Sequence, residues 1–133
     1  MGSEMCIRDR IKTDNAPAAI GTYSQAVQAG DTVYISGQIP LNPNSMEVVA
    51  DDFVSQAHQV FQNLEAIAVA SGSSLANVVK LTVYMVDLSD FSILNEVMAE
   101  YINEPYPARA AVQVVALPKD VLVEVDAILY LET

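Results

Sequence analysis

Positive charge is scarce in this chain of 133 residues. It has six Lys and Arg against 17 Asp and Glu, so the formal net charge is −11 at pH 7. Nucleic acids and anionic membranes are bound mainly by clustered Lys and Arg. No such cluster occurs outside the first ten residues. The composition therefore predicts neither a nucleic-acid partner nor a membrane partner.

Cysteine and long apolar runs are also lacking. The one cysteine, Cys6, excludes an internal disulfide framework and fits a reducing compartment, so we expect a cytoplasmic protein. No apolar run approaches the roughly 18 residues that cross a bilayer. Even so, 52% of the residues are hydrophobic and the mean hydropathy is +0.28. We expect part of this apolar surface to be buried between subunits.

Groups that serve in common catalytic and metal sites are few. His58 is the one histidine, and it lies off the apolar stripe of its predicted helix, so we expect it at the surface. No second His or Cys stands at metal-ligand spacing, and no phosphate-binding glycine motif or dinucleotide fingerprint is present. We therefore predict no zinc site, and Ser-His-Asp or Cys-His catalysis is disfavoured.

The hydrophobic pattern predicts one domain over residues 11–133. Residues 1–10 carry both signs of charge without periodicity, and we expect them to be an extraneous or disordered extension. Strands are expected at 23–28, 32–36, 78–86, 110–115 and 121–131. Helices are expected at 51–71, with one apolar face, and from 87–90 to just before Pro105, with Phe91, Leu94, Met98, Tyr101 and Ile102 buried.

This order, β-β-α-β-α-β-β, predicts an α+β domain of two layers, with a mixed sheet and both helices on one face. The short link at 117–120 favours a hairpin between the last two strands. The other face of the sheet is expected to pack against further subunits.

Arg109 is the one arginine after residue 10. A guanidinium binds a carboxylate through two parallel hydrogen bonds and stays charged at any working pH. Arg109 is therefore half of an internal ion pair or the receptor for a small anion. Its neighbours Pro107, Ala108, Ala110 and Ala111 are small or rigid and leave space beside it, which favours the receptor.

Two carboxylates, Glu124 and Asp126, interrupt the last apolar strand and share one of its faces. They lie on a solvated face, pair with Arg109 or Lys119, or take part in chemistry. Ser36 precedes Gly37 at a strand end and has no evident base. Such groups can hold a small carboxylate and orient a water molecule, which suits a reactive substrate rather than an inert amide or phosphate ester.

Seven short motifs occur in order over roughly residues 11–133. They are NAPAAIG at 15–21, YSQA at 23–26, SGQIP at 36–40, Asp90-Phe91 with Asn95, PARAAV at 107–112, LPKD at 117–120 and EVDAI at 124–128. Together they resemble the RidA (YjgF/YER057c/UK114) family of reactive intermediate, or enamine/imine, deaminases. The resemblance implies a chorismate-mutase-like fold and a homotrimer with sites between subunits.

The resemblance also implies a reaction. Family members hydrolyse 2-enamino and 2-imino acids, such as 2-aminoacrylate/2-iminopropanoate and 2-iminobutanoate, to 2-oxo acids and ammonia, without a cofactor or metal. By position, Arg109 would clamp the substrate carboxylate, and Glu124 would orient or activate the attacking water. The implied substrate-binding set is Tyr23 from a neighbouring subunit, Ser36, Gly37, Asn95, Arg109 and the backbone at Ala111.

Two positions depart from the family pattern. Thr22 stands where a proline is common, and Ala111 stands where some members carry cysteine. A thiol at position 111 is therefore not required in this chain.

Three other functions compete with this interpretation. A chorismate mutase usually needs several cations, and an RNA-acting protein needs a basic surface, so both are weak in this acidic chain. A non-enzymatic, small-carboxylate-binding or chaperone-like trimer would use the same residues and stays open.

Overall fold

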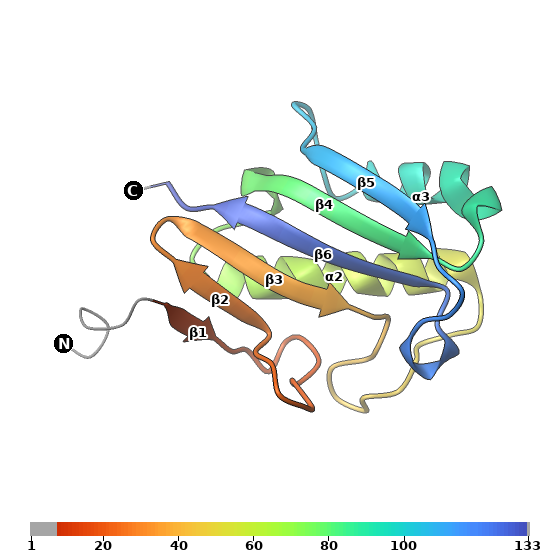
Figure 1. Ribbon diagram of the computed structural model, residues 1–133, viewed down its shortest axis with the longest axis horizontal. Coiled ribbons are helices and arrows are strands. Elements are labelled where there is room, and N and C mark those ends of the chain that lie inside the picture. Colours follow the sequence, from red (N-terminus) through yellow and green to blue (C-terminus); the bar gives the residue numbers. More distant parts are fainter. Residues whose placement is uncertain (1–7, 133) are drawn as a thin grey trace.

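The computed structural model describes residues 8–132 and consists of a six-stranded sheet with helices against one face (Figure 1). The strands are β1 (Asp9–Ile11), β2 (Ala26–Ala29), β3 (Thr32–Gln38), β4 (Val78–Met85), β5 (Ala108–Gln113) and β6 (Val123–Tyr130). The helices are α2 (Phe53–Ala70) and α3 (Phe91–Met98), with single 3-10 turns at Leu75–Asn77, Leu88–Asp90 and Pro118–Asp120. The two-layer α+β prediction with a mixed sheet is confirmed.

The strand order is β1-β2-β3-β6-β4-β5, and every neighbouring pair is antiparallel except β4 and β5. The predicted hairpin between the last two strands is therefore wrong. The crossover through α3 returns β5 parallel to β4, as a βαβ connection does. The end of β4 lies between β5 and β6. Val114 N, just after β5, donates to Met85 O, and Val86 N donates to the oxygen of Leu122, just before β6.

Part of the expected extension belongs to the sheet. Asp9 pairs with Gln28 and Arg10 with Val27, so β1 adds an edge strand. Met1–Ile7, including Cys6, lie outside the described residues. The domain boundary at residue 11 stays a prediction.

Helix α2 begins where its cap predicts. Asp52 Oδ2 accepts a hydrogen bond from Ser55 N at 2.8 Å, which satisfies one free amide of the first turn. Its predicted apolar face is confirmed, since all seven members are buried: Phe53, Ala57, Val60, Phe61, Leu64, Ile67 and Ala68. The helix therefore covers the sheet with a continuous apolar stripe.

The second helix is shorter and less buried than predicted. It ends at Met98, and Phe91 is 37% exposed instead of buried. Tyr101, beyond the helix end, stacks on Phe61 with ring centroids 5.5 Å apart, and its hydroxyl lies 2.8 Å from His58 Nδ1. His58 is thus half-buried between α2 and the segment after α3, and not a free surface residue.

The two faces of the sheet differ in chemistry. On β6, the predicted alternation is confirmed: Val123, Val125, Ala127 and Leu129 are buried toward the helices, while Glu124 and Asp126 lie on the opposite face. That opposite face, the open face, also carries the exposed side chains of Tyr34, Val112 and Tyr130. Within residues 8–132, neither helix is long and apolar enough to cross a membrane.

Candidate functional site

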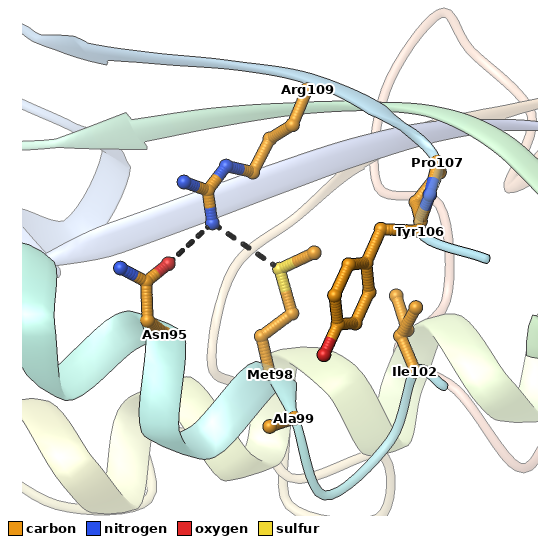
Figure 2. A pocket seen from close by; sticks show the side chains of 7 residues that line it. All are labelled: Asn95, Met98, Ala99, Ile102, Tyr106, Pro107 and Arg109. Atoms are coloured by element: carbon orange, nitrogen blue, oxygen red, sulfur yellow. Dashed lines mark hydrogen bonds between the residues drawn. The ribbon is translucent and has the colours of Figure 1, made fainter. Parts of the chain in front are cut away.

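The guanidinium of Arg109 is held in place by neutral groups. Arg109 pairs with Leu81 across β4 and β5, and its side chain extends toward α3 (Figure 2). Nη1 donates to Asn95 Oδ1 at 2.6 Å and lies 3.6 Å from Met98 Sδ. The Cζ atom lies 4.9 Å from the centroid of the Phe91 ring, a cation–π contact.

No described Asp or Glu makes an ion pair with Arg109; the single ion pair recorded for residues 8–132 joins His58 and Glu100. The internal ion pair that the sequence left open is therefore not formed within this part of the chain. A neutral amide orients the guanidinium without cancelling its charge. Arg109 can thus offer its remaining N–H groups to an anion.

A cavity of about 450 Å³ opens beside Arg109. Its lining combines polar groups with apolar side chains: Asn95, Met98, Ala99, Ile102, Tyr106, Pro107 and Arg109. Concave sites of a few hundred Å³ with a few convergent polar groups typically bind small molecules. A small carboxylate fits this combination of volume and charge.

A second cavity, of about 330 Å³, lies beside Glu124. Tyr23, Gly37, Lys119 and Glu124 are among its lining residues. Glu124 is half-buried, and this burial, followed by the charge of Asp126, raises its pKa above the ordinary value. A carboxyl whose pKa is raised binds a proton more readily, as a general base must.

Gly37 packs directly on Glu124. A register shift between Ile35 and Gln38 marks a bulge in β3, and Gly37 lies within it. A methyl group at Gly37 would overlap Glu124 Oε2 and lie 2.9 Å from Glu124 Cδ. The absent side chain is therefore what allows the carboxylate to lie against β3.

Ser36 and Gln25 hold the loop that presents Tyr23. Ser36 Oγ donates to Ser24 O at 2.6 Å, so this hydroxyl ties the loop to β3. Gln25 is buried, and its Nε2 donates to the carbonyl oxygens of Thr13, Ala16 and Pro17. Sequence reasoning missed Gln25; its signal was a polar residue just before a strand, within the YSQA motif.

Arg109 and Glu124 do not meet within one chain. Their strands are not neighbours, since β4 lies between β5 and β6, so the expectation of adjacent strands is wrong. Arg109 faces the helices with Leu81, and Glu124 faces the open side with Tyr84. Asn95 accompanies Arg109, whereas Tyr23 and Gly37 accompany Glu124. Ala111 lies on β5 two residues after Arg109. It is half-buried and packs against the hydrophobic core.

These features define a class of protein: a two-layer α+β domain that carries an anion receptor on its helix side and a half-buried carboxylate on its open side. A family model described as Endoribonuclease L-PSP matches residues 13–131. The chain belongs to this family, which is the RidA family that the motifs predicted.

Relatives of known name extend over nearly the whole chain. RidA from the Antarctic bacterium Psychrobacter sp. PAMC 21119 is 58% identical, with a TM-score of 0.90 over 92% of this chain and 99% of the other. The 2-iminobutanoate/2-iminopropanoate deaminase of Mus musculus is 49% identical over 122 residues, 92% of this chain and 90% of the mouse protein. E. coli TdcF with bound serine is 42% identical, with a TM-score of 0.88 over 93% and 99%. The predicted chorismate-mutase-like fold is thus confirmed.

Proposed function

We propose that this chain hydrolyses 2-imino acids and their enamine tautomers to 2-oxo acids and ammonia. The observation that carries the proposal is the guanidinium of Arg109, which makes no ion pair within residues 8–132, beside a cavity of about 450 Å³. Full-length similarity to a protein named 2-iminobutanoate/2-iminopropanoate deaminase supports the reaction. The serine bound to TdcF supports a ligand of amino-acid size.

The roles follow from the charges of the two groups. Arg109 binds the substrate carboxylate through two parallel hydrogen bonds. Glu124 accepts a proton from water as the water oxygen attacks the C=N carbon, which forms a carbinolamine. Glu124 passes that proton to the nitrogen and then carries the carbinolamine hydroxyl proton to the same nitrogen, so that the C=O bond forms, the C–N bond breaks, and ammonia leaves the 2-oxo acid. Tyr23, Ser36 and Gly37 shape the Glu124 side, and Asn95 and the backbone of Ala111 serve the Arg109 side.

The proposed site requires more than one subunit. Because Arg109 and Glu124 face opposite sides of one sheet, a substrate can touch both only where two copies meet. A homotrimer with sites between its subunits satisfies this condition. Exposed Tyr34, Val112 and Tyr130 on the open face supply apolar surface for such contacts. A cytoplasmic location, which the single cysteine supports, is part of this proposal.

The assay generates 2-iminobutanoate with threonine dehydratase and follows either 2-oxobutanoate release or trapping by semicarbazide. The native chain should accelerate release and lower trapping. Arg109→Ala should reduce kcat/KM by at least about 10²-fold, because two hydrogen bonds to a charged group contribute about 1.5–3 kcal/mol each. Lys12→Ala removes an exposed cation near the other edge of the sheet and should leave the rate unchanged.

Two results would overturn the proposal: no acceleration by the native chain, or full activity in Arg109→Ala. A non-enzymatic carboxylate binder would be stabilised by ligand without forming product, so the same assay separates it from an enzyme. A monomeric mass in solution would contradict the shared site.

A further inference from the structure

Glu124 lies beside a second carboxylate that the proposed reaction does not use. Asp126 follows two residues later on the same face of β6. Tyr84 on β4 is the cross-strand partner of Glu124, and its hydroxyl donates diagonally to Asp126 Oδ2 at 3.1 Å. All three side chains are half-buried. The phenol therefore fixes the Asp126 carboxylate in the neighbourhood of Glu124.

The surroundings leave this negative charge uncompensated. Lys119 and Tyr23 line the cavity that Glu124 enters, and Lys80 lies on the same face of β4, opposite Ile128. Neither carboxylate makes an ion pair with a lysine or arginine in the part of the chain that the structure describes. Burial, and then the charge and hydrogen bond of Asp126 and the charge of Glu124, raise the pKa of Tyr84. The hydroxyl thus remains a donor to Asp126 across the neutral range.

Placing two like charges on one half-buried face is unfavourable for folding alone. An apolar residue at position 126 would continue the pattern of Ile128 on the same face. The Tyr84 hydrogen bond shows that the carboxylate is accommodated in a defined orientation and does not turn freely into solvent. A charge so placed acts on Glu124, two residues away on the same face, as well as on Tyr84.

We propose that Asp126 is a positioning residue for Glu124: its charge, fixed by the Tyr84 hydroxyl, makes Glu124 a stronger base toward the attacking water. The inference rests on the imine hydrolysis proposed above. The effect of Asp126 is electrostatic and reaches the reaction through Glu124.

A nearby negative charge disfavours ionised Glu124, and burial acts in the same direction, so the pKa of Glu124 lies above its ordinary value. The base form is therefore lost at a higher pH than for an ordinary Glu as the solution is acidified. Removing the charge of Asp126 should move the acid limb of the pH profile to lower pH.

The test compares kcat/KM against pH for the wild type, Asp126→Asn and Asp31→Asn. Asp31→Asn removes the same charge at an exposed position at the far end of β3 and should leave the acid limb unmoved. Asp126→Asn should move the acid limb to lower pH. At the plateau it should lose only a few-fold in kcat, far less than the roughly 10²–10⁴-fold expected when a general base is removed by Glu124→Gln.

A titration independent of turnover completes the test. The carboxyl carbon of Glu124, labelled with 13C and assigned by its disappearance in Glu124→Gln, should titrate at lower pH in Asp126→Asn. Tyr84→Phe keeps the charge of Asp126, so its acid limb should move less than that of Asp126→Asn. An equal movement would assign the effect to the hydroxyl and overturn the inference.

The remaining outcomes separate this inference from the reaction on which it rests. If the wild type turns over but Asp126→Asn and Asp31→Asn have the same acid limb and the same Glu124 titration, the inference is overturned and the deaminase activity stands. If the wild type shows no turnover while the Glu124 titration moves in Asp126→Asn, the charge coupling stands and the deaminase proposal fails.

Discussion

The substitution Gly37→Ala tests whether the position of Glu124 determines turnover. The added methyl group would overlap Glu124 Oε2, so the carboxylate has to turn away from β3. General-base catalysis typically contributes about 10²–10⁴-fold, and misplacing a catalytic group by about 1 Å costs on the order of 10²-fold. We expect kcat in the deaminase assay to fall by about 10²-fold.

Folding should be little affected by the same change. Gly37 is exposed, and its φ lies outside the left-handed region that favours glycine. An alanine in a strand is commonly more favourable than glycine by about 0.5–1 kcal/mol, so the melting temperature should stay near that of the wild type. Gly21→Ala is the matched control, because its methyl group would lie 3.4 Å from the nearest atom of Tyr23, an ordinary contact.

A double-mutant cycle makes this prediction specific to Glu124. In a Glu124→Gln background the general base is already absent, so Gly37→Ala should cost little further kcat. Full activity in Gly37→Ala would refute the reasoning. So would a loss of the same size in the wild-type and Glu124→Gln backgrounds, since the methyl group would then act on something other than the carboxylate.

Two further predictions concern the helix side of the sheet. Asn95→Asp places a carboxylate where Arg109 Nη1 now finds an amide oxygen at 2.6 Å. The new ion pair should compete with the substrate carboxylate and raise KM at least about tenfold in steady-state kinetics, whereas Asn95→Ala should raise it less. An unchanged KM would show that Arg109 does not bind the substrate carboxylate. Tyr101→Phe removes the hydroxyl that contacts His58 Nδ1 at 2.8 Å; urea denaturation should show a loss of about 0.5–1.5 kcal/mol, whereas a stability equal to that of the wild type would mean that this contact contributes nothing.

Local elements were predictable because their patterns are short-range. The apolar face of α2 follows from the 3.6-residue period, and the alternation on β6 follows from the two-residue period. Asp52 stands where a helix cap is favoured, which located the start of α2 to within two residues. These features depend on residues that are neighbours in sequence.

Strand pairing could not be predicted in the same way, because it depends on contacts distant in sequence. A short turn between two strands suggested a hairpin, yet β6 pairs with β3 and β4. This error placed Arg109 and Glu124 on neighbouring strands. In the structure, their side chains lie on opposite faces of the sheet. Phe91 was assigned to the core by its helical spacing. Spacing alone does not show that the cation of Arg109 lies against the Phe91 ring. The motifs named Asn95 without revealing that it orients Arg109.

Strand β6 lies inside the sheet, with a hydrogen-bonded neighbour on either side, whereas β5 forms one edge. The carboxylate proposed for the chemistry is therefore anchored on a strand that cannot shift without breaking two ladders. The guanidinium proposed to grip the substrate is carried by a strand secured on one side only. Substitutions around β5 and α3 can thus change which substrates the site accepts, while the water-activating centre stays intact. The range of substrates and the reaction performed on them can diverge separately in this fold.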